Sequence, residues 1–120
     1  MDKVMIVGNK ILDGTTFEHK EVYEYGSPAT DVGTSDTTIL SVPSGKTFYA
    51  RTVVITNTAA SAVTVDIYDG SGGTHKMKVT VPATTTWSLS NIKGLTFTSA
   101  VVAVADATGA TMTVSGELTE

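Results

Sequence analysis

The chain has 120 residues, enough for one domain with its own hydrophobic core, and a formal net charge of −4. It contains no cysteine, which excludes a disulfide framework and a thiolate metal site. Its few basic residues are not clustered, and phosphate neutralisation needs clustered Lys and Arg, so we expect no binding to nucleic acid.

Residues that favour β-strands dominate the composition. The sequence holds 22 Thr and 15 Val, which together make up nearly a third of the chain. Leu, Glu, Lys and Arg, which favour helices, are scarce. We therefore predict an all-β protein.

The first apolar run of the chain, Val4 to Val7, bears on its location. It is too short for the core of a signal peptide and far too short to span a bilayer. We expect no signal peptide, no membrane association and synthesis in the cytoplasm.

Residues 1–36 differ from the rest of the chain. They contain seven acidic residues and three lysines, so they carry the whole net charge. Lys3–Val7 and Thr15–Tyr25 are candidate strands, Glu18–Glu24 is also compatible with a short helix, and Asp31–Thr38 is a polar linker. We predict an N-terminal arm over residues 1–36 and a β-sandwich domain over residues 37–120.

The function of the predicted arm has two interpretations. It is either a mobile extension or a segment that docks on a neighbouring subunit or partner. In the second case its aromatic residues are the candidate subunit contacts, namely Phe17, Tyr23 and Tyr25.

A seven-residue pattern, V-P-x-x-x-T-aromatic, occurs at Val42–Phe48 and again at Val81–Trp87. In both copies a β-branched residue ends one strand, proline removes a ladder N–H group, and a new strand follows a short turn. The pattern is typical of a chain that turns a corner between two sheets.

Strand patterns are regular after residue 36. The predicted strands are Thr37–Val42, Thr47–Asn57, Ala62–Asp69, Thr74–Val81, Thr85–Ser90, Leu95–Ala105 and Thr111–Leu118. About eight strands with proline-marked corners predict a two-sheet antiparallel β-sandwich of jelly-roll type. Asn57–Val65 and Asp106–Val114 resemble each other at an offset of 49 residues, which indicates two related hairpins.

Two long strands carry apolar residues on both faces, Thr47–Asn57 and Leu95–Ala105. In the first, Tyr49, Val53 and Ile55 alternate with Phe48, Ala50 and Val54. This pattern predicts burial between layers or between subunits. Because the rest of the surface is rich in Thr and Ser and poor in charges that would protect sheet edges, we predict a homo-oligomer, with a trimer as the favoured form.

The sequence contains no pattern typical of an active site. The two histidines, His19 and His75, are 56 residues apart, and His75 is predicted to lie on the apolar face of its strand. Asp66–Gly73 lacks the later acidic ligand of a calcium loop. No pair stands out among the carboxylates that a glycosidase would need, which are Asp66, Asp69, Asp106 and Glu117. We predict a protein that is not an enzyme and has no metal or cofactor.

A binding role would depend on exposed aromatic residues. Trp87 is in phase with Leu89, which predicts that it packs in the core. Tyr68 is in phase with Thr64 and Asp66 on the polar face of its strand. The candidate contacts for a ligand or partner are therefore Tyr68 and the loop residues Asp69 and Asp106.

Several segments resemble small all-β virion proteins of tailed phages and related viruses. These segments are Val42-Pro43-Ser44-Gly45-Lys46-Thr47, Val53-Val54-Ile55-Thr56-Asn57-Thr58, Val81-Pro82-Ala83 and Thr113-Val114-Ser115-Gly116-Glu117-Leu118. The resemblance covers residues 37–118 and implies a capsid decoration (cement) protein or a head or tail accessory protein. Such a protein is a jelly roll, often trimeric, and stabilises a capsid lattice without catalysis. The alternative is a β-sandwich module that binds a carbohydrate or a cell-surface receptor.

Overall fold

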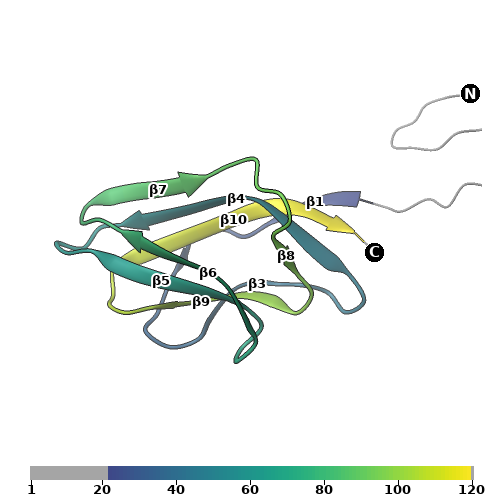
Figure 1. The fold of residues 1–120 in the computed structure, drawn as a ribbon, viewed down its shortest axis with the longest axis horizontal. Helices are drawn as coiled ribbons and strands as arrows, with labels where there is room; N and C mark the ends of the chain where they lie inside the picture. The colour runs from purple at the N-terminus through teal and green to yellow at the C-terminus, as the bar shows by residue number, and fades with distance from the viewer. Residues whose placement is uncertain (1–21, 120) are drawn as a thin grey trace, which may run out of the picture.

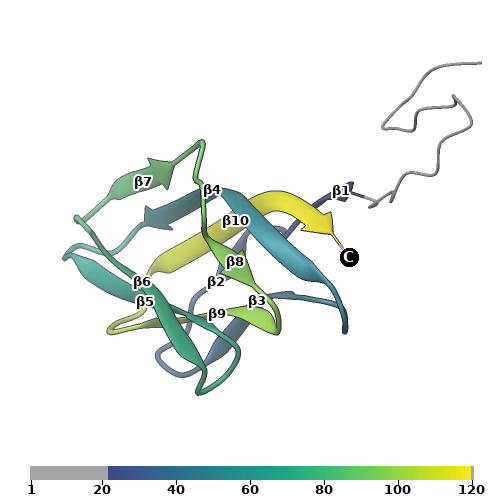
Figure 2. The same ribbon diagram turned by 45° about the vertical axis from the view of Figure 1, so that its right-hand side comes forward.

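A computed structural model describes residues 22–119, which form ten β-strands and no helix. The strands build two antiparallel sheets that face each other (Figure 1, Figure 2). Within these residues there is accordingly no helix with the length and apolar character needed to cross a membrane. The predictions of an all-β chain and of a sandwich of two antiparallel sheets are confirmed for this part of the protein.

The larger sheet, sheet A, has six strands in which the central pair is β10 (Ala110–Thr119) and β4 (Thr47–Asn57). The edge strands are β1 (Val22–Gly26) beside β10 and β7 (Thr85–Leu89) beside β4. Two short strands complete it, β2 (Thr30–Asp31) on β10 and β8 (Thr96–Phe97) on β4.

The smaller sheet, sheet B, has four strands in the order β3-β9-β5-β6. Their bounds are β3 (Thr37–Ser41), β9 (Ala100–Ala105), β5 (Val63–Asp69) and β6 (Thr74–Val81). Each neighbouring pair in this sheet is antiparallel.

The core fills the space between the two sheets. Along β5 the buried residues Val63, Val65 and Ile67 alternate with more exposed ones, as expected for a strand with one face in the core. The largest fully buried side chains come from both sheets and are Phe48, Phe97, Ile55, Ile67 and Met112. Burial of such side chains is the main favourable contribution to folding.

Both copies of the V-P pattern connect the two sheets, as predicted. The first leads from β3 in sheet B to β4 in sheet A, and the second from β6 in sheet B to β7 in sheet A. Equivalent positions in the two turns adopt positive φ angles, 80° at Gly45 and 51° at Thr84. The prediction from proline and turn composition was therefore correct about where the chain changes sheets.

The predicted boundary between an arm and the sandwich does not hold for residues 22–32. Residues 22–26 form β1 along the end of β10, with Val22 opposite Thr119, and β2 follows at residues 30–31. Val32 is only 3% exposed and belongs to the core. The polar alternation of this region is that of a half-exposed edge strand. The predicted features of residues 1–21 lie outside the described residues.

The apolar pattern on both faces of Thr47–Asn57 results from a β-bulge. Ser115 pairs with Thr52 and Gly116 pairs with Ala50, so Arg51 is an extra residue on β4. It shifts the alternation, and Phe48, Ala50, Val53 and Ile55 all face the core. Within the described chain this strand is fully buried on its core face only, because a period of two cannot reveal an inserted residue, and burial of its other face between subunits stays a prediction.

The predicted strand Leu95–Ala105 is two strands in different sheets. β8 pairs with β4 in sheet A, and β9 pairs with β3 and β5 in sheet B. The chain bends at Thr98 and Ser99, whose amides bind the carboxylate of Asp69. A continuous apolar run thus serves both sheets, and it is not evidence of a subunit interface.

The two segments that repeat at an offset of 49 residues are not hairpins. The first crosses from β4 to β5 and the second from β9 to β10, so both connect one sheet to the other. They lie side by side, since the amide of Thr58 donates to the carbonyl of Gly109 at 3.0 Å and that of Asp106 donates to Thr64 at 3.0 Å.

Replacement of Gly116 tests whether the bulge requires glycine at this position. A Cβ atom at this position would lie 2.0 Å from the carbonyl oxygen of Tyr49 in the neighbouring strand. We expect Gly116→Ala to lower the free energy of unfolding by at least about 3 kcal/mol in urea denaturation, because the backbone of β4 or β10 must move to make room for the methyl group. The control is Gly45→Ala, where φ is +80° and no atom lies within 4 Å of the new Cβ. Its expected cost is about 1 kcal/mol, and equal losses in the two variants would contradict this account.

Candidate functional site on the outer sheet faces

The interior between the sheets offers no reactive group among residues 22–119. Asn57, 1% exposed, is the one buried polar side chain in that range. Its Nδ2 donates to the carbonyls of Ser61, Val81 and Pro82 at 2.9 to 3.2 Å, and its Oδ1 accepts from the amide of Ala59 at 2.9 Å. This amide joins the end of β4 to the corner between β6 and β7. Any functional site on the described chain therefore lies on the outer faces or loops.

Asp69, a predicted ligand contact, organises the loop before β9. Its carboxylate accepts hydrogen bonds from the amides of Thr98, Ser99 and Ala100 at 2.9 to 3.4 Å, and from the hydroxyl of Thr98 at 3.2 Å. Partial burial raises the pKa of Asp69, but these hydrogen bonds outweigh it and lower the pKa below the ordinary value of 3.8. The carboxylate has a clear role in the fold.

Asp106, another predicted contact, performs a similar task between β9 and β10. Its Oδ1 accepts from the amide of Thr64 at 2.9 Å, and its own amide donates to the carbonyl of Thr64 at 3.0 Å. The two contacts hold the corners of the sandwich together. A ligand role for Asp69 and Asp106 stays a prediction.

Tyr68 lies on the outer face of sheet B, in a small polar cluster. Its ring contacts that of His75 edge to face, with centroids 5.0 Å apart, and His75 Nε2 lies 2.8 Å from Asp66 Oδ1. Val102 is opposite Tyr68 in the neighbouring strand and is only 2% exposed, although it is not part of the core cluster. Tyr68 and its neighbours thus cover an apolar residue on the outside of the sheet.

The predicted place of His75 on the apolar face was wrong. Ile67 pairs with Met77 and Tyr68 pairs with His75, so Lys76 is skipped in the register. This bulge moves His75 to the outer face, and the Lys76 ammonium lies 5.9 Å from the ring centroid of Phe97. The resulting contact between His75 and Asp66 is an ion pair only when the histidine is protonated.

The arrangement offers no metal site within residues 22–119. Nowhere in this range do three or more His, Cys, Asp or Glu side chains gather in a way that could hold an ion. Asp66 and Asp69, which flank the glycine-rich turn, bind to His75 and to the loop at Thr98 instead. Gly70 and Gly72 adopt φ angles of 87° and 70°, as expected for the hairpin turn that the sequence predicted.

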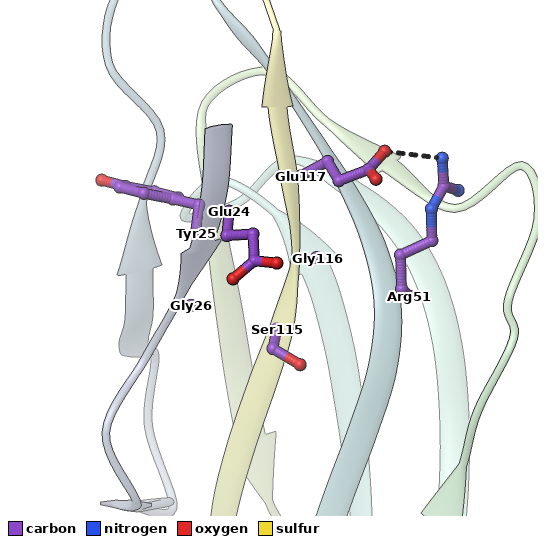
Figure 3. Close-up of a pocket in the computed structure, with 7 residues that line it drawn as sticks. All are labelled: Glu24, Tyr25, Gly26, Arg51, Ser115, Gly116 and Glu117. Atoms are coloured by element: carbon purple, nitrogen blue, oxygen red, sulfur yellow. Dashed lines mark hydrogen bonds and ion pairs between the residues drawn. The ribbon is translucent and has the colours of Figure 1, made fainter. Parts of the chain in front are cut away.

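The outer face of sheet A carries a groove that the sequence analysis missed (Figure 3). Its volume is about 540 Å³, and it is lined by Glu24, Tyr25, Gly26, Arg51, Ser115, Gly116 and Glu117. A second groove of about 560 Å³ shares Arg51 with the first and is also lined by Tyr49, Asn91, Ile92, Lys93 and Gly94. The sequence held one signal, because Arg51 is the only arginine and the only charge in Thr47–Asn57.

Arg51 fixes the loop between β7 and β8. Its guanidinium donates to Glu117 Oε1 at 3.2 Å and to the carbonyl of Ile92 at 3.3 Å, and it lies 5.6 Å from the centroid of Tyr49. The backbone adds a bond from the Ile92 amide to the Arg51 carbonyl at 3.1 Å. The Arg51 and Glu117 side chains are 39% and 44% exposed, so their ion pair contributes little to stability.

Glu24 and Glu117 lie directly opposite each other on β1 and β10. Like charges in such a pair are unfavourable. Of the two glutamates, Glu117 is the one that accepts a hydrogen bond from Arg51. In Figure 3 the Glu24 side chain points across β10 while Glu117 points toward Arg51. The groove is thus open and acidic on one side, and the Arg51 guanidinium and the Ser115 hydroxyl are side-chain donors in its lining.

The predicted arm residues have different environments. Tyr25 packs against Phe48 with ring centroids 6.0 Å apart, and its hydroxyl donates to the carbonyl of Ser41 at 3.0 Å. It therefore joins the two sheets of its own chain. Tyr23 is 46% exposed on β1, and Phe17 lies outside the described residues.

The lowered pKa of Asp69 should make the stability of the fold depend on pH. Because its pKa is lower in the folded chain, ionised Asp69 stabilises the fold at pH above 3.8, and this contribution is lost as the pH falls through the folded pKa. We expect Asp69→Asn to lower stability at pH 7 and to flatten its decline below about pH 4 in urea denaturation. Asp36→Asn is the control, since within residues 22–119 Asp36 accepts a hydrogen bond only from the hydroxyl of Ser71. An unchanged acid profile in Asp69→Asn would contradict the assignment.

Comparison with known proteins adds no family to this description. No protein-family model matches the chain, and no curated protein is significantly similar to it.

Proposed function

We propose that this protein is a jelly-roll β-sandwich that serves as a non-catalytic structural component of a virus particle. In this role it decorates and stabilises a capsid as a homo-oligomer, favoured as a trimer, and contacts a capsid or other virion protein. The single observation that carries the proposal is the order of the strands in the two sheets.

The strand order supports the jelly-roll assignment. Sheet A has the order β1-β10-β4-β7 and sheet B has the order β3-β9-β5-β6. The first and last strands are neighbours, and eight main strands form two four-stranded sheets in which every connection crosses to the other sheet except the hairpin of β5 and β6. Two sheets of four strands built from Greek keys define a jelly roll, an architecture used by viral capsid and lectin domains.

The polar residues support a role in shape and assembly. Asn57, Asp69 and Asp106 direct their polar atoms at the backbone of corners and loops. The grooves beside Arg51 are open, and the interior of the described sandwich is apolar. This distribution fits a protein that provides a stable surface for assembly, in agreement with the resemblance of residues 37–118 to virion proteins.

Light scattering coupled to size-exclusion chromatography tests the assembly. We expect the full chain at micromolar concentration to have about three times its monomer mass of 12.5 kDa. A stable mass of 12.5 kDa would contradict the oligomer.

Immunogold labelling tests the location. Antibodies raised against the purified chain should label the outside of intact virus particles harvested from the culture that expresses the gene. Labelling confined to host cells, with clean particles beside them, would contradict the virion assignment.

The cluster of Tyr68, His75 and Asp66 favours one second candidate, a carbohydrate- or receptor-binding module. A glycan array separates the two functions. On the structural proposal the wild-type chain binds no glycan. Glycan binding that Tyr68→Ala abolishes and Tyr49→Ala on the opposite sheet leaves intact would favour the second candidate and contradict the first.

A further inference from the structure

Four charged side chains form a row across one end of the outer face of sheet A. Glu24 on β1 lies opposite Glu117 on β10, and Glu117 accepts a hydrogen bond from Arg51 on β4 (Figure 3). Lys93 follows in the loop between β7 and β8, on the far side of β4 from β10, and lines a groove together with Arg51. The order across the sheet is therefore acid, acid, base, base. The β1 side of sheet A is acidic and the β7 side is basic.

The two outer charges of this row lack partners within residues 22–119. Both Glu24 and Lys93 are exposed, and neither side chain takes part in a hydrogen bond or an ion pair in that range. Glu24 is also placed opposite Glu117, and like charges at such a position in adjacent strands are unfavourable. A cation supplied from outside the chain would offset this repulsion.

The exposed apolar side chains gather at the same two sides of sheet A. The exposed large hydrophobic residues of the described chain are Val22 and Tyr23 on β1 and Leu89 on β7. These are the two edge strands of the sheet. A contact that covers both edges therefore removes all three side chains from water, which is favourable.

The backbone of the β7 edge is unprotected. An edge strand exposes N–H and C=O groups that can pair with another strand, and proteins block it with charges, prolines or bulges. β6 at an edge of sheet B carries Lys76, Lys78 and a bulge. The residues of β7, Thr85 to Leu89, include no charge and no proline, and they pair with β4 in an unbroken register. The β7 edge is thus suited to pairing with a further strand.

We propose that the β7 side of one copy binds the β1 side of the next copy, with Lys93 of the first paired to Glu24 of the second. The inference rests on the oligomer of the proposed function and assigns its contact. A row that carries both signs is complementary to a second copy of itself, whereas a partner of one sign would be repelled by half of the row.

The strand directions agree with this contact. The pairs β1–β10, β10–β4 and β4–β7 are all antiparallel, so β1 and β7 run in opposite directions. A next copy in the same orientation therefore sets its β1 antiparallel to β7, and sheet A continues from one chain to the next. The contact joins two different surfaces, so it is heterologous, and three copies that close into a ring give the favoured trimer.

Charge reversal at the two ends of the row tests the contact in the full chain. We expect Glu24→Lys and Lys93→Glu each to reduce the mass at low ionic strength from about three times 12.5 kDa to 12.5 kDa, because each variant brings like charges together. The double variant exchanges the two charges and should recover the wild-type mass. Lys78→Glu, at an exposed lysine of sheet B, is the matched control and should keep it.

Urea denaturation separates loss of the contact from loss of the fold. At a dilution that dissociates the wild type, Glu24→Lys should unfold at the same or a higher urea concentration, because it replaces a like-charge pair by an opposite-charge pair. A lower midpoint shows that Glu24 stabilises its own chain and overturns the inference.

The masses distinguish failure of the contact from failure of the proposed function. Single variants that keep the wild-type mass, or a double variant that stays at 12.5 kDa, overturn the contact and leave the oligomer standing. A wild-type chain of 12.5 kDa contradicts the oligomer itself and the contact with it.

Discussion

One extra residue in the central strand of sheet A controls the rest of the structure. Arg51 is inserted opposite Ser115 and Gly116, and this bulge allows an eleven-residue strand to keep Phe48 and Ile55 on the same side. The close approach of the two backbones requires glycine at position 116. With the bulge, both ends of β4 contribute to one core. The same bulge turns Arg51 outward, where its guanidinium and carbonyl bind the loop at Ile92.

Polar side chains then hold the connections between the sheets. Asn57 joins the end of β4 to the second V-P corner, Asp106 joins the two crossings at its end of the sandwich, and Asp69 fixes the bend that separates β8 from β9. Each satisfies backbone groups that would otherwise lose hydrogen bonds where strands end. These polar groups therefore bind the corners and loops of their own chain. This is the physical basis for proposing a role in shape and assembly.

The apolar faces that suggested subunit contacts belong to a bulged strand and to a run shared by two sheets, so most of their side chains pack in the core of one chain. What remains is the edge of β7, which lacks charge, proline and bulge, and a Thr- and Ser-rich surface with few charges. An interface built on backbone pairing needs no large apolar patch, which is consistent with the few large hydrophobic side chains that are exposed among the described residues, namely Val22, Tyr23 and Leu89.

The sequence by itself determined the all-β class, the two proline corners, the glycine hairpin turn and most strand positions after residue 36. These follow from local rules, since proline, positive-φ glycine and alternation act within a few residues. Only the tertiary structure decided the register. Single inserted residues at Arg51 and Lys76 invert which side chains face the core, and they moved His75 to the outer face beside Tyr68. It also decided that residues 22–32 belong to the sandwich and that Asp69 and Asp106 bind distant backbone amides. Such contacts depend on which strands become neighbours, and no local pattern in the sequence encodes that.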